Sequence, residues 1–170
     1  MSDKYHDLVD FQYRNSGGDY TELFRTILLL ADEMGWDNAW KCLERCIVEK
    51  RLAWLDKTLE MLPRTGNPVL DGYKAFFEVY LGVSAPGQGE IVEATDKRLV
   101  TRWWNQCPTL DACRKLGLDT REICRKAYHE PVQAFLAKID PRLRFARNYA
   151  ALRPYTPYCE EIITLDDSTK

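Results

Sequence analysis

Cysteine is the residue type in this sequence with the most capacity for chemistry, and Cys107 has the most favourable setting of the six. It follows a β-branched and aromatic run that includes Trp103 and Trp104, and it precedes Pro108. Cys107 is therefore expected between a strand and a helix N-terminus, where unpaired backbone N–H groups and the helix dipole favour a thiolate. The alternative is that it packs beneath one of the tryptophans.

Two later cysteines have settings that could support the first. Cys124 is expected near the start of a helix, with flanking arginines that add positive charge. Cys159 is expected in the last strand, where alternation puts its side chain on the face shared with Glu161. We expect Cys107, Cys124 and Cys159 to meet at one site, and packing in the helix and sheet core is the alternative for each.

Two residues could move protons for such a thiol. His129 is one of only two histidines, and it is the candidate imidazole partner for a cysteine nucleophile. It lies five residues after Cys124, which in an α-helix is neither the same face nor the opposite one. A solvated position beside Pro131 is the alternative interpretation. Glu160, next to Cys159, is the second candidate for proton transfer.

A basic run in the strand before Cys159 could bind an anion. Alternation places Arg142 and Arg144 on one face of this strand and Arg147 on the other. Arg144 is expected to hold a substrate carboxylate, with Trp103 or Trp104 as an apolar wall. A solvated strand face is the competing interpretation.

The other cysteines are expected to be structural. Cys42 and Cys46 lie four residues apart, on one face of a long helix, and Cys113 lies among leucines on a short amphipathic helix. Cysteine is among the residue types most often buried, so packing is the preferred interpretation for all three.

Metal binding is the alternative use of the thiols. The spacing of Cys107, Cys124 and Cys159 differs from that of zinc knuckles, in which paired cysteines lie two to four residues apart. A three-thiolate site gathered from separate elements, holding zinc or an iron–sulfur centre, stays open as an alternative.

The elements that would position these residues follow from periodicity and from helix-capping signals. Helices are expected over residues 19–34, 37–62, 68–81, 108–116 and 119–139, and strands over 90–95, 98–104, 142–148 and 158–165. Pro131 is expected to bend or interrupt its helix. Residues 1–18 should form a loosely docked arm and 166–170 a frayed tail.

This order of elements predicts an α+β fold, with a helical N-terminal half followed by an antiparallel sheet of about four strands packed against helices. A length of 170 residues predicts a single domain, with a helical region at 1–83 and a cysteine-containing α+β region at 90–165.

Composition limits the partners and the compartment. The formal net charge of −2 provides no field for nucleic acid or an anionic membrane, and no apolar run is long enough for a membrane span. We expect a cytoplasmic protein with reduced thiols and a small-molecule substrate or ligand, and a homo-oligomer is compatible with the sequence.

Short motifs around the thiols resemble those of a known family. Trp104-Asn105-Gln106-Cys107-Pro108 after a strand, then Cys124, then Tyr158-Cys159-Glu160, resemble the L-2-amino-thiazoline-4-carboxylic acid hydrolase family. The layout is also more distantly similar to 4-vinyl reductase-type ligand-binding domains. The resemblance implies a cytoplasmic α+β domain that hydrolyses a cyclic amidine-like C–N bond in a small carboxylated substrate.

These observations give one leading hypothesis and two rivals. The leading one is a cysteine-dependent hydrolase that requires no cofactor, with Cys107, Cys124, Cys159 and His129 as catalytic residues. Its substrate contacts would come from five residues, namely Trp104, Asn105, Arg144, Tyr158 and Glu160. The first rival is a thiolate-based metal, iron–sulfur or small-molecule binding module without hydrolase activity. The second is an assembly protein whose cysteines are inert.

Overall fold

The computed structural model describes residues 3–168, with side chains from residue 5 onward, and its chain divides into two compact units. Unit 1 comprises the described residues of Met1–Lys50 and Gln106–Pro131, and unit 2 comprises those of Arg51–Asn105 and Val132–Lys170. Each unit therefore draws on both the expected helical region 1–83 and the expected α+β region 90–165. The boundaries fall inside two helices, α3 (Trp36–Thr58) and α7 (His129–Ile139).

Unit 1 is entirely helical in its regular structure. Besides the first part of α3 and the start of α7, it contains α1 (Asp3–Arg14), α2 (Thr21–Met34), α5 (Pro108–Leu116), α6 (Thr120–Ile123) and the π-helical segment η3 (Cys124–Tyr128). Glycines end α2 and α5 as expected, since Gly35 and Gly117 adopt φ values of 86° and 67° that other residues rarely reach.

The prediction of a loosely docked N-terminal arm is wrong for the residues that the structure describes. Residues 3–14 form helix α1, and Val9 and Tyr13 are buried in the unit 1 core. The polar and aromatic mixture of this stretch hid an amphipathic pattern in which few apolar positions carry the packing.

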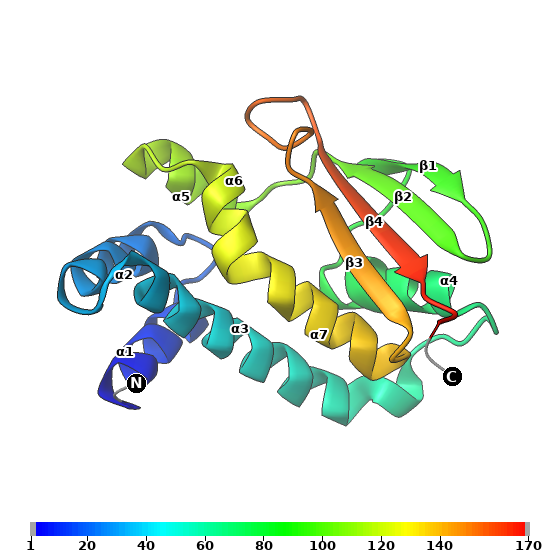
Figure 1. Ribbon diagram of the computed structural model, residues 1–170, viewed down its shortest axis with the longest axis horizontal. Helices are drawn as coiled ribbons and strands as arrows, with labels where there is room; N and C mark the ends of the chain where they lie inside the picture. Colours follow the sequence, from blue (N-terminus) through cyan, green and yellow to red (C-terminus); the bar gives the residue numbers. More distant parts are fainter. Residues whose placement is uncertain (1–2, 169–170) are drawn as a thin grey trace. The chain divides into compact units, whose positions relative to one another are not determined.

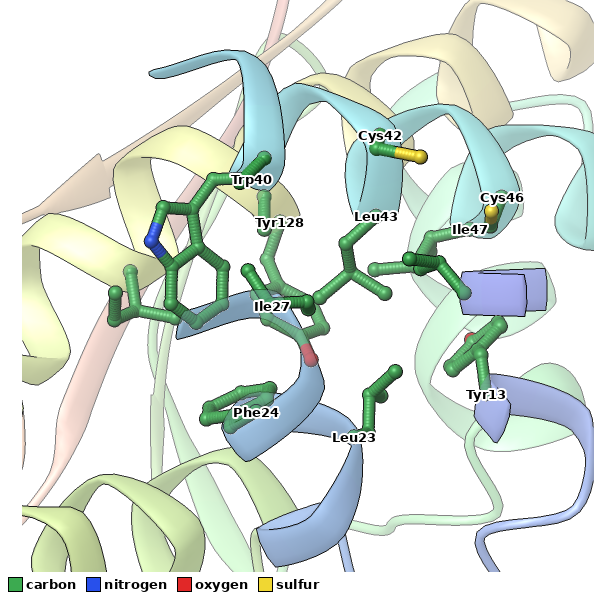
Figure 2. Packing of buried hydrophobic residues seen from close by; sticks show 14 of the residues in the cluster. Tyr13, Leu23, Phe24, Ile27, Trp40, Cys42, Leu43, Cys46, Ile47 and Tyr128 are labelled. Carbon is green, nitrogen blue, oxygen red and sulfur yellow. The ribbon is translucent and has the colours of Figure 1, made fainter. Parts of the chain in front are cut away.

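The unit 1 core is a dense apolar cluster (Figure 2). Trp40 and Leu43 of α3 pack with Phe24 and Ile27 of α2, and the Phe24 and Trp40 rings meet edge to face at 5.0 Å. Tyr128 of η3 belongs to the same cluster.

Unit 2 combines helices with a four-stranded sheet. Its elements are the remainder of α3 and of α7, a 3-10 turn η1 (Leu59–Met61), α4 (Pro68–Tyr73), the π-helical segment η2 (Lys74–Tyr80), β1 (Gly89–Ala94), β2 (Arg98–Trp103), β3 (Leu143–Asn148) and β4 (Cys159–Leu165). Asn67 caps α4 as expected, because its Oδ1 accepts from the backbone N–H groups of Val69 and Leu70 at 2.9 and 3.2 Å.

All pairings in the sheet are antiparallel, in the order β1-β2-β4-β3. Figure 1 shows β4, drawn in red, between β2 and β3. One face carries Leu99, Trp103, Phe145 and Ile163 and packs against Val69 and Tyr73 of α4, so we call it the α4 face. The α+β class, the helical N-terminal half and the four antiparallel strands packed on helices are confirmed.

Pro131 does not end its helix, which continues to Ile139. The change comes earlier, because Cys124–Tyr128 adopts π-helical hydrogen bonding ahead of the proline. Proline lacks the N–H that would bond to the carbonyl of Ala127, so a widened turn just before it leaves fewer groups without partners.

The end of the described chain is more ordered than the expected tail. The backbone N–H of Asp166 donates to the carbonyl of Arg142 at 2.9 Å, and the carboxylate of Asp166 accepts from the backbone N–H of Ser168. Residues 169–170 lie outside the described part. Within residues 3–168, no helix has both the length and the apolar character that crossing a bilayer requires.

Candidate functional site

Cys159 has the most distinctive contact of the six thiols. It is the first residue of β4 and lies opposite Trp103 of β2. Nε of Arg153 donates to its sulfur at 3.4 Å, and Nη1 of the same side chain donates to the carbonyl of Asn105 at 2.6 Å. A guanidinium is thus fixed beside a partly exposed thiol. This places a positive charge where negative charge on sulfur would develop.

A buried ion pair occupies the same face of β4. Nε of Arg147 donates to Oε1 of Glu161 at 2.8 Å, Nη2 lies 2.7 Å from the same oxygen, and the two side chains are only 8% and 10% exposed. Glu161 is two residues after Cys159, so the two side chains emerge on one face about 7 Å apart along the strand. The α4 face therefore carries charge as well as apolar side chains.

Trp103 forms the apolar floor beside this pair. Its indole N–H donates to the hydroxyl of Thr101 at 2.8 Å, and its ring stacks on Phe77 with a centroid distance of 4.8 Å. Gly89 of β1 lies against this ring, because an added Cβ would come within 2.3 Å of a Trp103 ring carbon. Glycine is thus required where β1 passes the indole.

Glu160 lies on the opposite face of the sheet from Cys159. Oε1 accepts from the Asn148 amide and Oε2 from Nε of Arg102, both at 2.9 Å. These bonds, that from Asn148 first, lower the pKa of Glu160 from its ordinary value. Tyr158 is close to the same group, since the Arg102 guanidinium lies 4.5 Å from its ring centroid. Glu160 is therefore held ionised, which disfavours a role as proton donor to Cys159.

Two other expected binding residues are engaged elsewhere in unit 2. Trp104 is 45% exposed, and its indole N–H donates to the carbonyl of Gly87 at 3.0 Å. Arg144 donates to the carbonyl of Pro141 at 2.7 Å and lies 3.4 Å from Asp166. It is four residues along β3 from Asn148, a separation of about 13 Å. Arg144 is therefore far along the sheet from the end that carries Cys159.

Cys107 lies in unit 1 at the position that the sequence predicts. It is the N-cap residue of α5, with extended backbone angles of φ −135° and ψ 107°, and its side chain does not make the capping hydrogen bond. The thiol is partly exposed. Buried neighbours follow on the same helix, where burial raises the pKa of Cys113 to about 12.

Cys124 and His129 bracket the π-helical segment of unit 1. Cys124 is its first residue, and His129 follows its last. Hydrogen bonds from residue i to i+5 bring residues five apart closer to one face than an α-helix does. The expectation that Cys124 and His129 lie on different faces of an α-helix therefore does not apply. π-Helical turns are also frequent at functional sites.

The remaining thiols, Cys42 and Cys46, are packed into the unit 1 core (Figure 2). Both are 0% exposed, and the sulfur of Cys46 lies 3.8 Å from the carbonyl oxygen of His6. A hydrogen bond to Cys42 and burial both raise the pKa of Cys46. All six cysteines lie in the described part of the chain, and none is in a disulfide.

Among residues 3–168, no group of three or more His, Cys, Asp or Glu side chains is placed to hold a metal ion. Cys107, Cys124 and His129 belong to unit 1, whereas Cys159 belongs to unit 2. The geometry described for each group is internal to its own unit.

Sequence reasoning missed the two guanidinium contacts of the α4 face. Arg153 lies in a loop, and its approach to Cys159 depends on how that loop folds back, which no local pattern encodes. Glu161 gave a usable signal, because a charged residue stands between Cys159 and Ile163 at an inward position of an otherwise apolar alternation.

No family model, curated protein or solved structure matches this chain.

Proposed function

We propose that this protein is a cysteine-dependent hydrolase acting on a cyclic amidine-like C–N bond of a small carboxylated substrate, with Cys159 as the reacting thiol. The contact between Arg153 and Cys159 carries the proposal. A fixed guanidinium gives a negatively charged substrate a partner beside the reacting sulfur.

The reaction follows from thiol chemistry. The sulfur of Cys159 adds to the amidine-like carbon, the C–N bond breaks, and the departing nitrogen takes the proton that the thiol gave up. Water then adds its hydroxyl group to that carbon, the C–S bond to Cys159 breaks, and the remaining proton of the water returns to the sulfur. The net change is the addition of one water across the C–N bond, and no redox partner is needed.

The environment of Arg153 suits it to hold the substrate. Nε contacts the sulfur and Nη1 is anchored on Asn105, whereas Nη2 makes no hydrogen bond to a residue that the structure describes. A substrate carboxylate can therefore accept from Nη2 near the reacting sulfur. This assigns to Arg153 the carboxylate-holding role that the sequence suggested for Arg144.

Cys107 is the second candidate for the reacting thiol. Its place at the N-cap of α5 puts backbone N–H groups and the positive end of a nine-residue helix next to the sulfur. Cys124 and His129, which bracket the π-helical segment of the same unit, would then be candidates for proton transfer. We place the activity in the cytoplasm, where six reduced cysteines are expected to persist.

The test compares single variants on one substrate. Hydrolysis of L-2-amino-thiazoline-4-carboxylate, followed by mass spectrometry as the gain of one water, is measured for wild type, Cys159→Ser, Cys107→Ser and Cys113→Ala. We expect Cys159→Ser to lose at least about 100-fold in kcat/KM, while Cys113→Ala, the matched buried control, keeps wild-type activity.

Other outcomes have defined meanings. Loss on Cys107→Ser with full activity of Cys159→Ser would move the reacting thiol to unit 1. Saturable binding of the compound by calorimetry, without turnover in any variant, would identify a ligand-binding module. Neither binding nor turnover of this compound or of related cyclic amidines would overturn the proposal.

A further inference from the structure

A buried guanidinium without a hydrogen-bond acceptor among the described residues lies in unit 2. Arg51 of α3 is only 7% exposed, and its Nε and Nη1 are buried with no hydrogen-bond partner among the described residues. No carboxylate in the described part of the chain forms an ion pair with it. Buried arginines are otherwise found paired, as Arg147 is with Glu161.

The surroundings of Arg51 are aromatic. Its guanidinium carbon lies 5.1 Å from the ring centroid of Phe76 and 5.7 Å from that of Tyr80. Ring faces attract a cation, but they accept none of its N–H bonds in the way an oxygen does. The aromatic contacts therefore offset only part of the cost of burying the charge.

The two rings are presented by a π-helical segment. Phe76 and Tyr80 both belong to η2, and their rings stack at 6.0 Å with an interplanar angle of 19°. The backbone N–H of Leu81 closes the segment on the carbonyl of Phe76 at 3.0 Å. A π-helical turn is a rare element that is over-represented at functional sites, and this one presents both rings to the Arg51 guanidinium.

The cluster also limits the ligand chemistry. Phe135 packs edge to face on Phe76 at 5.2 Å, and Trp54 on Tyr80 at 4.9 Å, so the rings are already in contact with one another. What Arg51 lacks is an acceptor with negative charge. A carboxylate or phosphate that places one oxygen at Nη2 can place a second oxygen at Nε or Nη1, which is the forked geometry that these groups take with arginine.

We infer that Arg51 is the recognition cation of an oxyanion-binding site, whose ligand presents a carboxylate or a phosphate group to the guanidinium. The site is independent of the proposed hydrolase, because neither Cys159 nor Arg153 takes part in it. The aromatic cluster sets the low dielectric that strengthens the charge-assisted bonds once the anion is present.

Thermal unfolding in different anions tests the site. The unfolding midpoint of the full chain is measured in sodium chloride, sodium acetate and sodium phosphate at equal ionic strength, for wild type, Arg51→Met and Arg51→Lys. We expect the wild-type midpoint to rise by about 3–6 °C at an anion concentration ten times the dissociation constant. Arg51→Met should lose this rise and be at least as stable as wild type in chloride, since its unpaired buried charge is gone.

The variants and salts separate the possible results. A response to acetate alone identifies a carboxylate ligand, and a response to phosphate alone identifies a phosphorylated one. Arg98→Met, which removes an exposed arginine paired with Glu93, is the control and should keep the full response. An equal response in Arg51→Met, or no response in wild type, would overturn the inference.

A second measurement does not require the methionine variant to fold. The ¹⁵N resonance of Arg51 Nε is followed in wild-type protein during titration with acetate and with phosphate, with Arg51→Lys used to assign it. A saturable shift at this nitrogen supports the site. The inference is overturned if the resonance stays unchanged in both titrations and Arg51→Met is destabilised equally in all three salts. Arg51 would then have only a structural role, through its cation–π contacts.

Discussion

The buried cysteines of unit 1 and Cys159 of unit 2 lie in opposite surroundings. In unit 1, Cys42, Cys46 and Cys113 lie fully buried in an apolar cluster, and burial raises the pKa of Cys113 to about 12. In unit 2, Cys159 lies at the end of β4 with the Arg153 guanidinium against its sulfur. The difference shows that the neighbouring charge and the exposure, rather than the cysteine itself, decide which thiol can react.

An exposed ion pair of unit 1 also contrasts with a buried ion pair of unit 2. In unit 1, Asp19 and Lys115 form an exposed pair at 3.0 Å near the start of α2. In unit 2, Arg147 and Glu161 form a pair within the packed α4 face of the sheet. The unit 2 pair is therefore buried two residues from Cys159, whereas the unit 1 pair lies at the surface.

The largest expected effect is in thiol reactivity. Iodoacetamide at pH 7.5 should alkylate Cys159 at least about 100-fold faster than Cys113, measured by mass spectrometry of the modified peptides over time. Only a thiolate attacks iodoacetamide, and the Cys113 thiol, with a pKa of about 12, is almost wholly protonated at this pH.

An Arg153 variant sharpens this result. Arg153→Met removes the hydrogen bond from Nε to the sulfur while keeping most of the side-chain volume, so alkylation of Cys159 should slow while Cys107 is unaffected. Equal alkylation rates at Cys159 and Cys113 in wild type would show that the surroundings of these two thiols do not change their reactivity.

The next effect is in stability. Glu161→Leu removes the carboxylate to which the buried Arg147 donates and should lower the free energy of unfolding by about 3–5 kcal/mol, measured by urea denaturation. The double variant Arg147→Met with Glu161→Leu should recover most of this loss, since replacing both charges with apolar side chains removes the unpaired group.

An exposed pair is the matched control for that experiment. Arg98 and Glu93 contact each other at 3.1 Å with both side chains 43% exposed, so Glu93→Leu should cost no more than about 1 kcal/mol. If the two single variants lose the same stability, the Arg147–Glu161 pair behaves as a surface pair despite its burial.

Local signals account for the parts of the fold that the sequence predicts. Asn67-Pro68, Gly117 and Asp119 each specify a helix start or end through their own backbone and side-chain bonds, and the structure has each of them in that role. The strands followed from β-branched and aromatic runs. The same logic placed Cys107 at the start of α5, because a proline after a strand marks a helix N-terminus.

The contacts that were not predicted depend on long-range folding. Arg153 reaches Cys159 through the path of a loop, and Arg51 becomes buried only when η2 presents its rings. The change from α to π geometry at Cys124 was also missed, since the sequence signal for it is a single proline seven residues later, and that signal predicted a kink. Helix α1 was missed because its apolar positions are few.

The smallest effect concerns the exposed charge of unit 1. The hydroxyl of Thr21, then its backbone N–H, then Lys115 stabilise the Asp19 carboxylate and lower its pKa from 3.8 to about 2. Because the folded-state pKa is depressed, the stabilisation is complete above the ordinary pKa and is lost as pH falls from about 3.8 through 2.

A valine at position 21 isolates the largest of these contributions. Thr21→Val keeps the side-chain shape and the backbone N–H but removes the hydroxyl, so the Asp19 pKa, followed by the ¹³C shift of its carboxyl carbon, should rise part of the way towards 3.8. Lys115→Met should raise it less, because an exposed ammonium is screened by water and salt. If Lys115→Met produced the larger rise, the ion pair rather than the helix-end hydrogen bonds would control this charge. The surface of unit 1 would then depend on paired charges as the α4 face of unit 2 does.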